Sequence, residues 1–281
     1  MNMKKILSFP KTILIGVACL ALSWAPANLG DENKPTTNDN TIKKEVAVNP
    51  LNILENQAMT AYQAIGLEQL GLPFDVFEKA YIGFLNLKDS QKISEESSVL
   101  SIADFSQSSK KKRLWIVDLK DSSLLLNTWV SHGRGSGGDI PTKFSNINNS
   151  HQSSLGFYVT GEVYYGKHGR SLRLDGMDNG FNSNARQRAI VMHGASYVSP
   201  QAIKSLDRLG LSHGCPAVPV ELTNQIIDLV KDKNVLYIHA NSPEYRSVYL
   251  NPETAGRKLL ASFDNNSSAL ETSLVESHVG I

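Results

Sequence analysis

Residues 190 to 218 hold the side chains that are best suited to covalent chemistry. Cys215 follows His213 by two positions, and His193 lies further upstream in the same segment. A cysteine attacks as the thiolate, and a neighbouring imidazole removes the thiol proton or stabilises the resulting charge. These residue types at this spacing predict a cysteine nucleophile. A small buried cysteine without a chemical role is the alternative.

The same three side chains permit a second kind of site. One thiolate and two imidazoles can bind zinc, so a metal centre at Cys215, His193 and His213 is an alternative interpretation. The spacing supplies no fourth ligand, and we therefore expect neither a metal nor another cofactor. Four other histidines have no partner that spacing identifies and are expected to be structural or exposed: His151, His168, His239 and His278.

The first 27 residues have the three-part layout of a secretory signal peptide. A basic stretch ending at Lys11 precedes an apolar run, and small residues at an A-x-A spacing follow it. We expect cleavage after Ala27 and export of the remaining chain. Lipidation of Cys19 is an alternative, although the residues before it lack the usual leucine. Export would leave Cys215 without a cysteine partner, which favours a functional thiol or an intermolecular disulfide.

Charge and hydropathy exclude several functions. The chain has 28 basic and 27 acidic side chains and a formal net charge of +1, which does not favour nucleic acid or another strongly charged partner. No apolar run after the signal peptide approaches the roughly 20 residues that span a bilayer, so no transmembrane segment is expected in the mature chain. We expect a soluble, exported monomer with one substantial core.

Composition divides the rest of the chain into four parts. Residues 28–50 are polar and are predicted to form a disordered linker. Residues 51–98 carry apolar side chains at three- and four-residue steps in two runs, which predicts a helical hairpin that packs on the main domain. Residues 99–240 are predicted to form that main domain, and residues 241–281 a loosely packed polar tail.

The main domain has the pattern of a mainly β fold. Short segments rich in β-branched and aromatic residues alternate with clusters of turn-forming residues. The predicted strands are residues 99–105, 113–119, 124–131, 155–160, 171–174, 189–192 and 235–239. Two short helices flank the cysteine: one runs from Ser199 to Gly210, and the other follows Pro219. His193 thus ends a strand and Cys215 lies in a turn, where a scaffold fixes side chains and leaves them accessible.

Several motifs resemble those of the L,D-transpeptidases, enzymes with a YkuD-type catalytic domain that cross-link peptidoglycan. The main ones are His193-Gly194 and the later Ser212-His213-Gly214-Cys215, whose continuation gives the signature SHGCPAV. Residues 153–157 and 130–133 are similar to other parts of a divergent branch of this family. The resemblance covers residues 99 to 240 and implies a β-sandwich-like catalytic domain with short helices beside the catalytic loop.

The resemblance implies a two-step acyl transfer. The thiolate would attack the carbonyl between diaminopimelate and the terminal D-alanine of a stem tetrapeptide, which releases D-alanine and forms a thioester. An amine of a neighbouring stem would then take the acyl group and form a 3–3 cross-link, whereas attack by water would make the protein a carboxypeptidase. A non-catalytic wall-binding protein on the same fold is a further alternative. Each possibility implies the periplasm or cell envelope of a bacterium.

The resemblance also implies roles within the main motifs. Cys215 would be the nucleophile, His193 the base, and the Gly194 carbonyl the group that orients the imidazole. His213 would line the site. The backbone N–H groups of Gly214 and Cys215 would stabilise the oxyanion, and one such donor typically contributes about 3 kcal/mol in the transition state.

The sequence departs from the family pattern after the cysteine, where Pro216-Ala217-Val218 stands in place of the usual asparagine or arginine. A guanidinium suits a stem-peptide carboxylate. The candidates for this contact, with ordinary surface arginines as the alternative, are Arg188, Arg173 and Arg170. Ser212 is expected to support the turn by hydrogen bonding and to border the substrate. His132, in a glycine-rich loop, either borders the cleft or is a solvated loop histidine.

Overall fold

The computed structural model describes residues 49–262 of the chain. The predicted signal peptide, most of the predicted linker and the last part of the predicted tail lie outside the described residues, as do Cys19 and His278. The described residues belong to one compact unit. No helix of this part of the chain combines the length and the apolarity that a membrane span requires.

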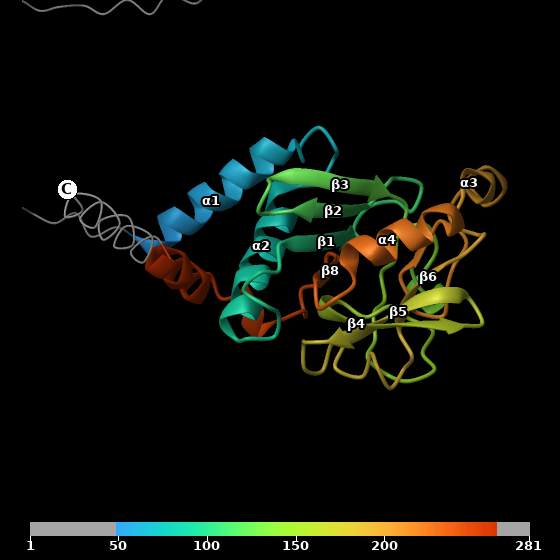
Figure 1. Ribbon diagram of the computed structural model, residues 1–281. Helices are drawn as coiled ribbons and strands as arrows, with labels where there is room; N and C mark the ends of the chain where they lie inside the picture. Colours follow the sequence, from blue (N-terminus) through green and yellow to red (C-terminus); the bar gives the residue numbers. More distant parts are fainter. Residues whose placement is uncertain (1–48, 263–281) are drawn as a thin grey trace, which may run out of the picture. The chain divides into compact units, whose positions relative to one another are not determined.

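Two helices form a hairpin before the sheet. Helix α1 (Pro50–Ile65) begins after Asn49, whose side chain accepts a hydrogen bond from the Leu51 N–H at 3.0 Å, and it ends at Gly66 in the left-handed conformation. Helix α2 (Phe74–Asp89) follows Pro73. The two helices lie along one side of the first three strands (Figure 1), and they share an apolar core with them.

One eight-stranded sheet forms the main framework, which confirms the mainly β prediction (Figure 1). The strands are β1 Val99–Asp104, β2 Leu114–Asp118, β3 Ser123–Thr128, β4 Gly156–Gly166, β5 Gly169–Gly176, β6 Val191–Gly194, β7 Ala217–Val218 and β8 Val235–His239. Their order in the sheet is β3-β2-β1-β8-β4-β5-β6-β7. The β1–β8 and β6–β7 pairs are parallel. Strand β8 therefore joins the first three strands to the half of the sheet that carries His193.

Alternate residues of the central strands point to opposite faces of the sheet, where two apolar cores form. In β1, Leu100 and Ile102 belong to the core shared with the hairpin, whereas Ala103 belongs to the second core. In β8, Tyr237 and Ile238 divide in the same way. Helix α4 (Thr223–Val230) contributes to the second core. Because both faces are covered, apolar residues of the central strands face both cores rather than alternating with exposed polar residues.

Helix α3 is shorter than the sequence predicts. It covers Pro200–Leu206 after Ser199, whose hydroxyl accepts a hydrogen bond from the Ala202 N–H at 3.3 Å. The helix ends at Asp207, which adopts the left-handed conformation, so the predicted end at Gly210 is wrong. A Cβ at Gly210 would lie 2.3 Å from the Cβ of Tyr197. Close packing against this aromatic side chain therefore explains the glycine.

The segment after residue 241 is packed as far as the structure describes it, which corrects the prediction of a loose tail. Asp178 accepts hydrogen bonds from the Tyr245 hydroxyl at 2.7 Å and from the Ser247 hydroxyl at 2.5 Å. Tyr249 and Ala255 are buried in the core that includes the hairpin. The polar composition is misleading here because one buried carboxylate and a few apolar contacts hold the segment in place.

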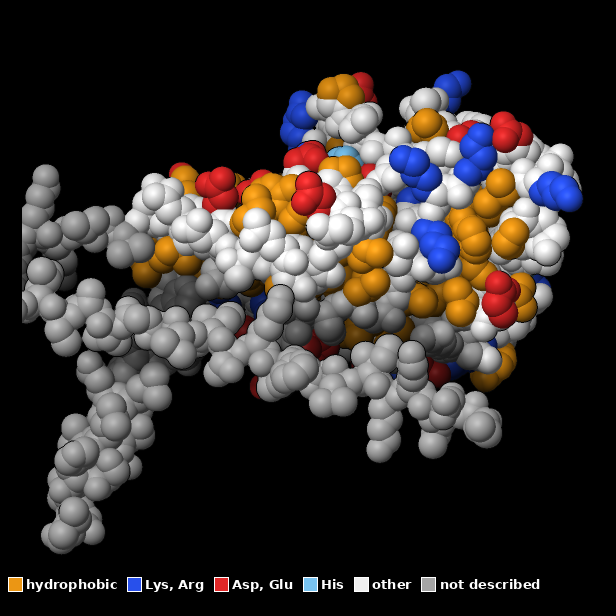
Figure 2. All heavy atoms as spheres, turned by 90° about the horizontal axis from the view of Figure 1, so that it is seen from above, with side chains coloured by type: hydrophobic (Ala, Val, Ile, Leu, Met, Phe, Trp, Pro, Cys, Tyr) orange, Lys and Arg blue, Asp and Glu red, His pale blue; other side chains and the backbone are white. Residues whose placement is uncertain are grey.

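The face of the molecule seen in Figure 2 carries basic, acidic and apolar side chains intermixed, without one continuous field of either charge. The most exposed large apolar side chains of the described residues include Val248, Tyr165 and Ile147.

Candidate active site

A tight turn between α3 and β7 carries the cysteine. The Ser212 hydroxyl donates a hydrogen bond to the Cys215 carbonyl at 2.6 Å and accepts one from the Gly214 N–H at 3.0 Å. Gly214 has a φ of +122°, which residues with a Cβ rarely adopt, and an added Cβ would lie 2.7 Å from the Gln152 carbonyl oxygen. The serine and the glycine together produce the turn that presents Cys215.

Cys215 is a partly buried free thiol. It donates to the Ala189 carbonyl oxygen, which lies 3.7 Å from Sγ. Burial raises the pKa of the Cys215 thiol, whereas the Val191 N–H and the positive charges of Arg188 and Lys167 act in the opposite direction. Because burial has the largest effect, the resting thiol is protonated at neutral pH, and attack requires a base that removes the proton.

His193 lies at the end of β6, where strand pairing with Ser171 of β5 and Ala217 of β7 fixes its backbone. Its Nδ1 lies 3.0 Å from the Gly194 carbonyl oxygen. A carbonyl only accepts, so Nδ1 carries the proton and Nε2 keeps the lone pair that a general base needs. His193 is 2 % exposed, and this burial lowers the pKa of its imidazole and keeps the ring neutral.

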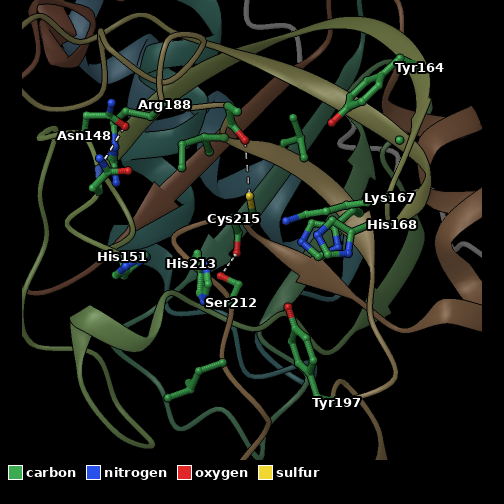
Figure 3. Close-up of a pocket in the computed structure, with 17 residues that line it drawn as sticks. Asn148, His151, Tyr164, Lys167, His168, Arg188, Tyr197, Ser212, His213 and Cys215 are labelled. Carbon is green, nitrogen blue, oxygen red and sulfur yellow. Dashed lines mark hydrogen bonds between the residues drawn. The ribbon is translucent and has the colours of Figure 1, made fainter.

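Cys215 and His193 line the same cavity, which has a volume of about 450 Å³ (Figure 3). The wall comes from the β4–β5 turn, β6, the cysteine turn and the loop before β4. The polar lining residues outside the predicted set are Asn148, Asn149, His151, Tyr164, Lys167, His168 and Tyr197. No aspartate or glutamate occurs among the lining residues, all of which the structure describes. The cavity is therefore electrostatically suited to a ligand that carries carboxylates.

The backbone donors near the thiol differ in availability. The Gly214 N–H is engaged by the Ser212 hydroxyl. The Cys215 N–H donates to no other residue in the described part of the chain, and it lies close to its own sulfur. Of the two predicted oxyanion donors, the Cys215 N–H is therefore the one that is available in this structure. His213 also lines the cavity, and its ring centroid lies 4.5 Å from that of His151.

Arg188 lines the cavity, but its guanidinium already forms hydrogen bonds with the loop before β4. The guanidinium donates to the carbonyl oxygens of Ser145 at 2.5 Å and Gln152 at 2.6 Å. It also donates to the hydroxyls of Ser150 and Ser154, each at 3.2 Å. Arg188 therefore fixes this loop beside the cysteine turn, and its positive charge acts on the thiol.

The two other candidate arginines lie outside the residues that line the cavity. Arg173 Nε lies 2.8 Å from Glu162 Oε1, and its guanidinium stacks over the Tyr164 ring. Arg170 pairs with Asp228, with 2.7 Å between Nη2 and Oδ1. Each guanidinium already has a carboxylate partner within the fold. Both arginines therefore form ion pairs within the fold in this structure, and a substrate contact by Arg173 or Arg170 stays a prediction.

His132 is neither solvated nor part of the cavity, which corrects both expectations for this residue. Its side chain is fully buried, and its Nδ1 accepts a hydrogen bond from Arg113 Nη2 at 2.7 Å. Burial, followed by the charge of Arg113, lowers the pKa of His132 to about 4. The His132 carbonyl accepts the Ser212 N–H at 2.9 Å, so this neutral, buried residue supports the cysteine turn from behind.

The alternative zinc site is not formed. Within residues 49–262, no three histidine, cysteine, aspartate or glutamate side chains are grouped so that they could hold a metal ion. Cys215, His193 and His213 line one cavity but do not converge as a ligand set. The three residues border a shared space that a substrate can enter.

Sequence reasoning missed the contribution of the β4–β5 turn to the cavity. The prediction ends one strand at residue 160 and begins the next at residue 171, whereas β4 and β5 continue to a two-residue turn of Lys167 and His168. Both residues line the cavity, as does His151. The sequence does contain a pattern that predicts this hairpin: the run Val163-Tyr164-Tyr165 is followed by Gly166 and Gly169, three positions apart.

Comparison with known families agrees with this geometry. A family model described as the L,D-transpeptidase catalytic domain matches residues 68–239, which is more than half of the chain. The protein therefore belongs to the L,D-transpeptidase catalytic domain family. A comparison with curated proteins found no match.

Several solved structures are similar to this chain. An L,D-transpeptidase from Mycobacterium smegmatis has 15% sequence identity and a TM-score of 0.31, and the match covers 51% of this chain and 59% of that chain. A variant of the helical cell shape determining protein from Campylobacter jejuni has 15% identity and a TM-score of 0.38, with coverages of 68% and 63%. An L,D-transpeptidase from Stackebrandtia nassauensis has 10% identity and a TM-score of 0.32, with coverages of 69% and 93%. The chain thus spans about three-fifths of the length of the first two.

Proposed function

We propose that the protein is a peptidoglycan L,D-transpeptidase that acts through a thioester at Cys215. The sulfur attacks the carbonyl that links diaminopimelate to the terminal D-alanine of a stem tetrapeptide. His193 Nε2 takes the thiol proton and gives it to the D-alanine amine as the C–N bond breaks. An amine of a neighbouring stem peptide then attacks the thioester, forms the 3–3 cross-link and releases the thiol.

One observation carries this proposal: a thiol and a neutral imidazole line one cavity, and burial shifts their pKa values in opposite directions. The raised pKa of Cys215 and the lowered pKa of His193 both favour the uncharged pair. The thiol therefore depends on general-base activation by the imidazole rather than on a preformed ion pair. The Gly194 carbonyl supports this role because it keeps the proton on Nδ1.

The lining of the cavity supports a substrate of this class. Stem peptides carry several carboxylates, and the lining residues include basic side chains and amides but no acid. The cysteine turn further supplies the Cys215 N–H for the oxyanion. We include in the proposal that the protein is exported into the bacterial cell envelope and acts there as a monomer. Ser212 and His213 remain proposed neighbours of the bound peptide.

Incubation with purified disaccharide tetrapeptides tests the proposal against its alternatives. A transpeptidase releases D-alanine and forms dimers with a 3–3 cross-link, both of which chromatography with mass spectrometry detects. Release of D-alanine without dimers would identify the protein as an L,D-carboxypeptidase, and binding without any release would identify it as a wall-binding protein. Cys215→Ala and His193→Gln should abolish or strongly reduce release. Arg170→Gln is a matched control because this arginine lies outside the cavity lining.

A further inference from the structure

His168, in the β4–β5 turn, lies nearly parallel to the imidazole of His193. The two ring centroids are 4.2 Å apart, and the ring planes differ by 20°. This separation leaves no room for a water molecule between the rings. His168 is itself exposed, whereas His193 is only 2 % exposed although it lines an open cavity. His168 therefore covers one face of the candidate base and separates it from solvent.

The sheet, rather than a long loop, determines where the His168 ring lies. Gly166 pairs with Gly169 across the end of the β4–β5 hairpin, so only Lys167 and His168 form the turn. Gly169 has a φ of +74°, the conformation that such a tight turn demands. Two residues later, Ser171 pairs directly with His193 in β6. The register of three neighbouring strands thus brings the two imidazoles together.

We propose that His168 is a positioning residue that holds the imidazole of His193 in its plane and shields it from water. The hydrogen bond from Nδ1 to the Gly194 carbonyl fixes one edge of the ring. Contact with His168 fixes one face, so that Nε2 stays directed into the cavity. The structural part of this inference is independent of the reaction, and only its effect on catalysis rests on the proposed function.

The charges around the stacked rings come from several elements. Lys167 lies on the same turn, and its side chain extends toward Cys215 in Figure 3. The other titratable or charged side chains that line the cavity are His151, Tyr164, Arg188, Tyr197, His213 and Cys215. Burial has the largest lowering effect on the pKa of His193, and the neighbouring His168 and Lys167 lower it further. Removal of the His168 ring would admit water and remove one of these neighbours, so both changes raise the pKa of His193.

An NMR titration of the histidine ring signals tests the structural part of the inference in a protein that lacks only residues 1–27, the predicted signal peptide. The His193 signal is assigned by its loss in His193→Gln. His168→Ala should raise the pKa of His193 toward its unperturbed value of about 6.5. His168→Phe should raise it less than His168→Ala does, because phenylalanine keeps an aromatic cover and removes only the charge of the neighbouring imidazole. An unchanged His193 titration in His168→Ala would overturn the inference.

The same variants connect the stack to the reaction. In His168→Ala, D-alanine release at neutral pH should fall by about ten-fold, because a misaligned base loses part of the 10²–10⁴-fold that proton transfer contributes. The acid limb of the pH profile should also move to higher pH, and both effects should be smaller in His168→Phe. Equal defects in the two variants would contradict a stacking role. If the wild type releases no D-alanine, the proposed function fails, and the NMR titration still decides the role of His168.

Discussion

Replacing Arg188 with methionine tests whether this residue holds the cavity wall or binds the substrate. Its guanidinium donates to the carbonyl oxygens of Ser145 and Gln152 at 2.5 and 2.6 Å and to two hydroxyls at 3.2 Å. Arg188→Met keeps much of the apolar contact of the side chain but removes all four hydrogen bonds and the charge. The loop before β4 would then lose four of the hydrogen bonds that hold it beside the cysteine turn.

The expected loss of stability follows from the two short hydrogen bonds. A hydrogen bond to a charged group contributes about 1.5–3 kcal/mol, so the two bonds to carbonyls contribute about 3–6 kcal/mol when fully buried. Arg188 is only half-buried, so water replaces part of this contribution, and the two hydroxyls can turn to water. We therefore expect the free energy of unfolding to fall by about 2–4 kcal/mol. That is a large share of the roughly 5–15 kcal/mol that stabilises a typical domain.

Urea denaturation of the wild type, Arg188→Met and Arg188→Lys measures this loss. Lysine keeps the charge without the forked geometry, so Arg188→Lys should fall between the other two proteins. The rate of Cys215 alkylation by iodoacetamide provides a second readout. Loss of the Arg188 charge should move its pH dependence to higher pH, because that charge lowers the pKa of the thiol. If the stability of Arg188→Met is unchanged and its KM for tetrapeptide is raised, this reasoning is refuted and Arg188 binds the substrate.

Three further substitutions test other parts of the site. Gly214→Ala should cost about 1–3 kcal/mol of stability and slow alkylation of the cysteine, because a Cβ at φ +122° would meet a carbonyl oxygen at 2.7 Å; wild-type stability and reactivity would contradict this. His132→Gln should weaken the pH dependence of the unfolding free energy between pH 6.5 and about 4. In the wild type, His132 binds a proton in this pH range when the chain is unfolded but not when it is folded, so stability falls by about 3 kcal/mol as the pH is lowered. If the urea midpoint falls by the same amount in both proteins between pH 7 and pH 4, this expectation is excluded. Lys167→Gln should raise the pKa of the Cys215 thiol and Lys167→Arg should not, as measured by alkylation rate against pH; a shift in both variants would point to the shape of the turn instead of its charge.

Much of the sheet could be predicted because local patterns reflect burial. Residues 113–119 and 235–239 are strongly apolar runs, and β2 and β8 lie within them. The two-residue strand β7 has no such pattern, since it is defined by its pairing with β6 and by a bridge between Ala217 and Ser131. Helix α3 ends at Asp207 instead of Gly210 because the glycine serves packing against Tyr197, and a distant contact of this kind has no local signal.

The candidate site was predictable where chemistry depends on neighbours in sequence. The turn from Ser212 to Cys215 is closed by its own hydrogen bonds, so its motif is informative. His132 is different, because the surrounding glycines indicate solvent while its burial depends on Arg113, 19 residues away. The stacking of His168 on His193 likewise depends on strand register. Contacts between strands and across loops are set by the whole fold, and single-sequence patterns do not report them.

The central claim is that Cys215 carries the acyl group, and intact-mass spectrometry tests it most directly. The wild type, mixed with disaccharide tetrapeptide and quenched early, should gain the mass of the substrate less D-alanine. Hydroxylamine should remove the adduct, as expected for a thioester. Cys215→Ala should gain no mass, and His193→Gln should gain it more slowly. An equal adduct on Cys215→Ala, or no adduct on wild type that is folded and releasing D-alanine, would contradict the account.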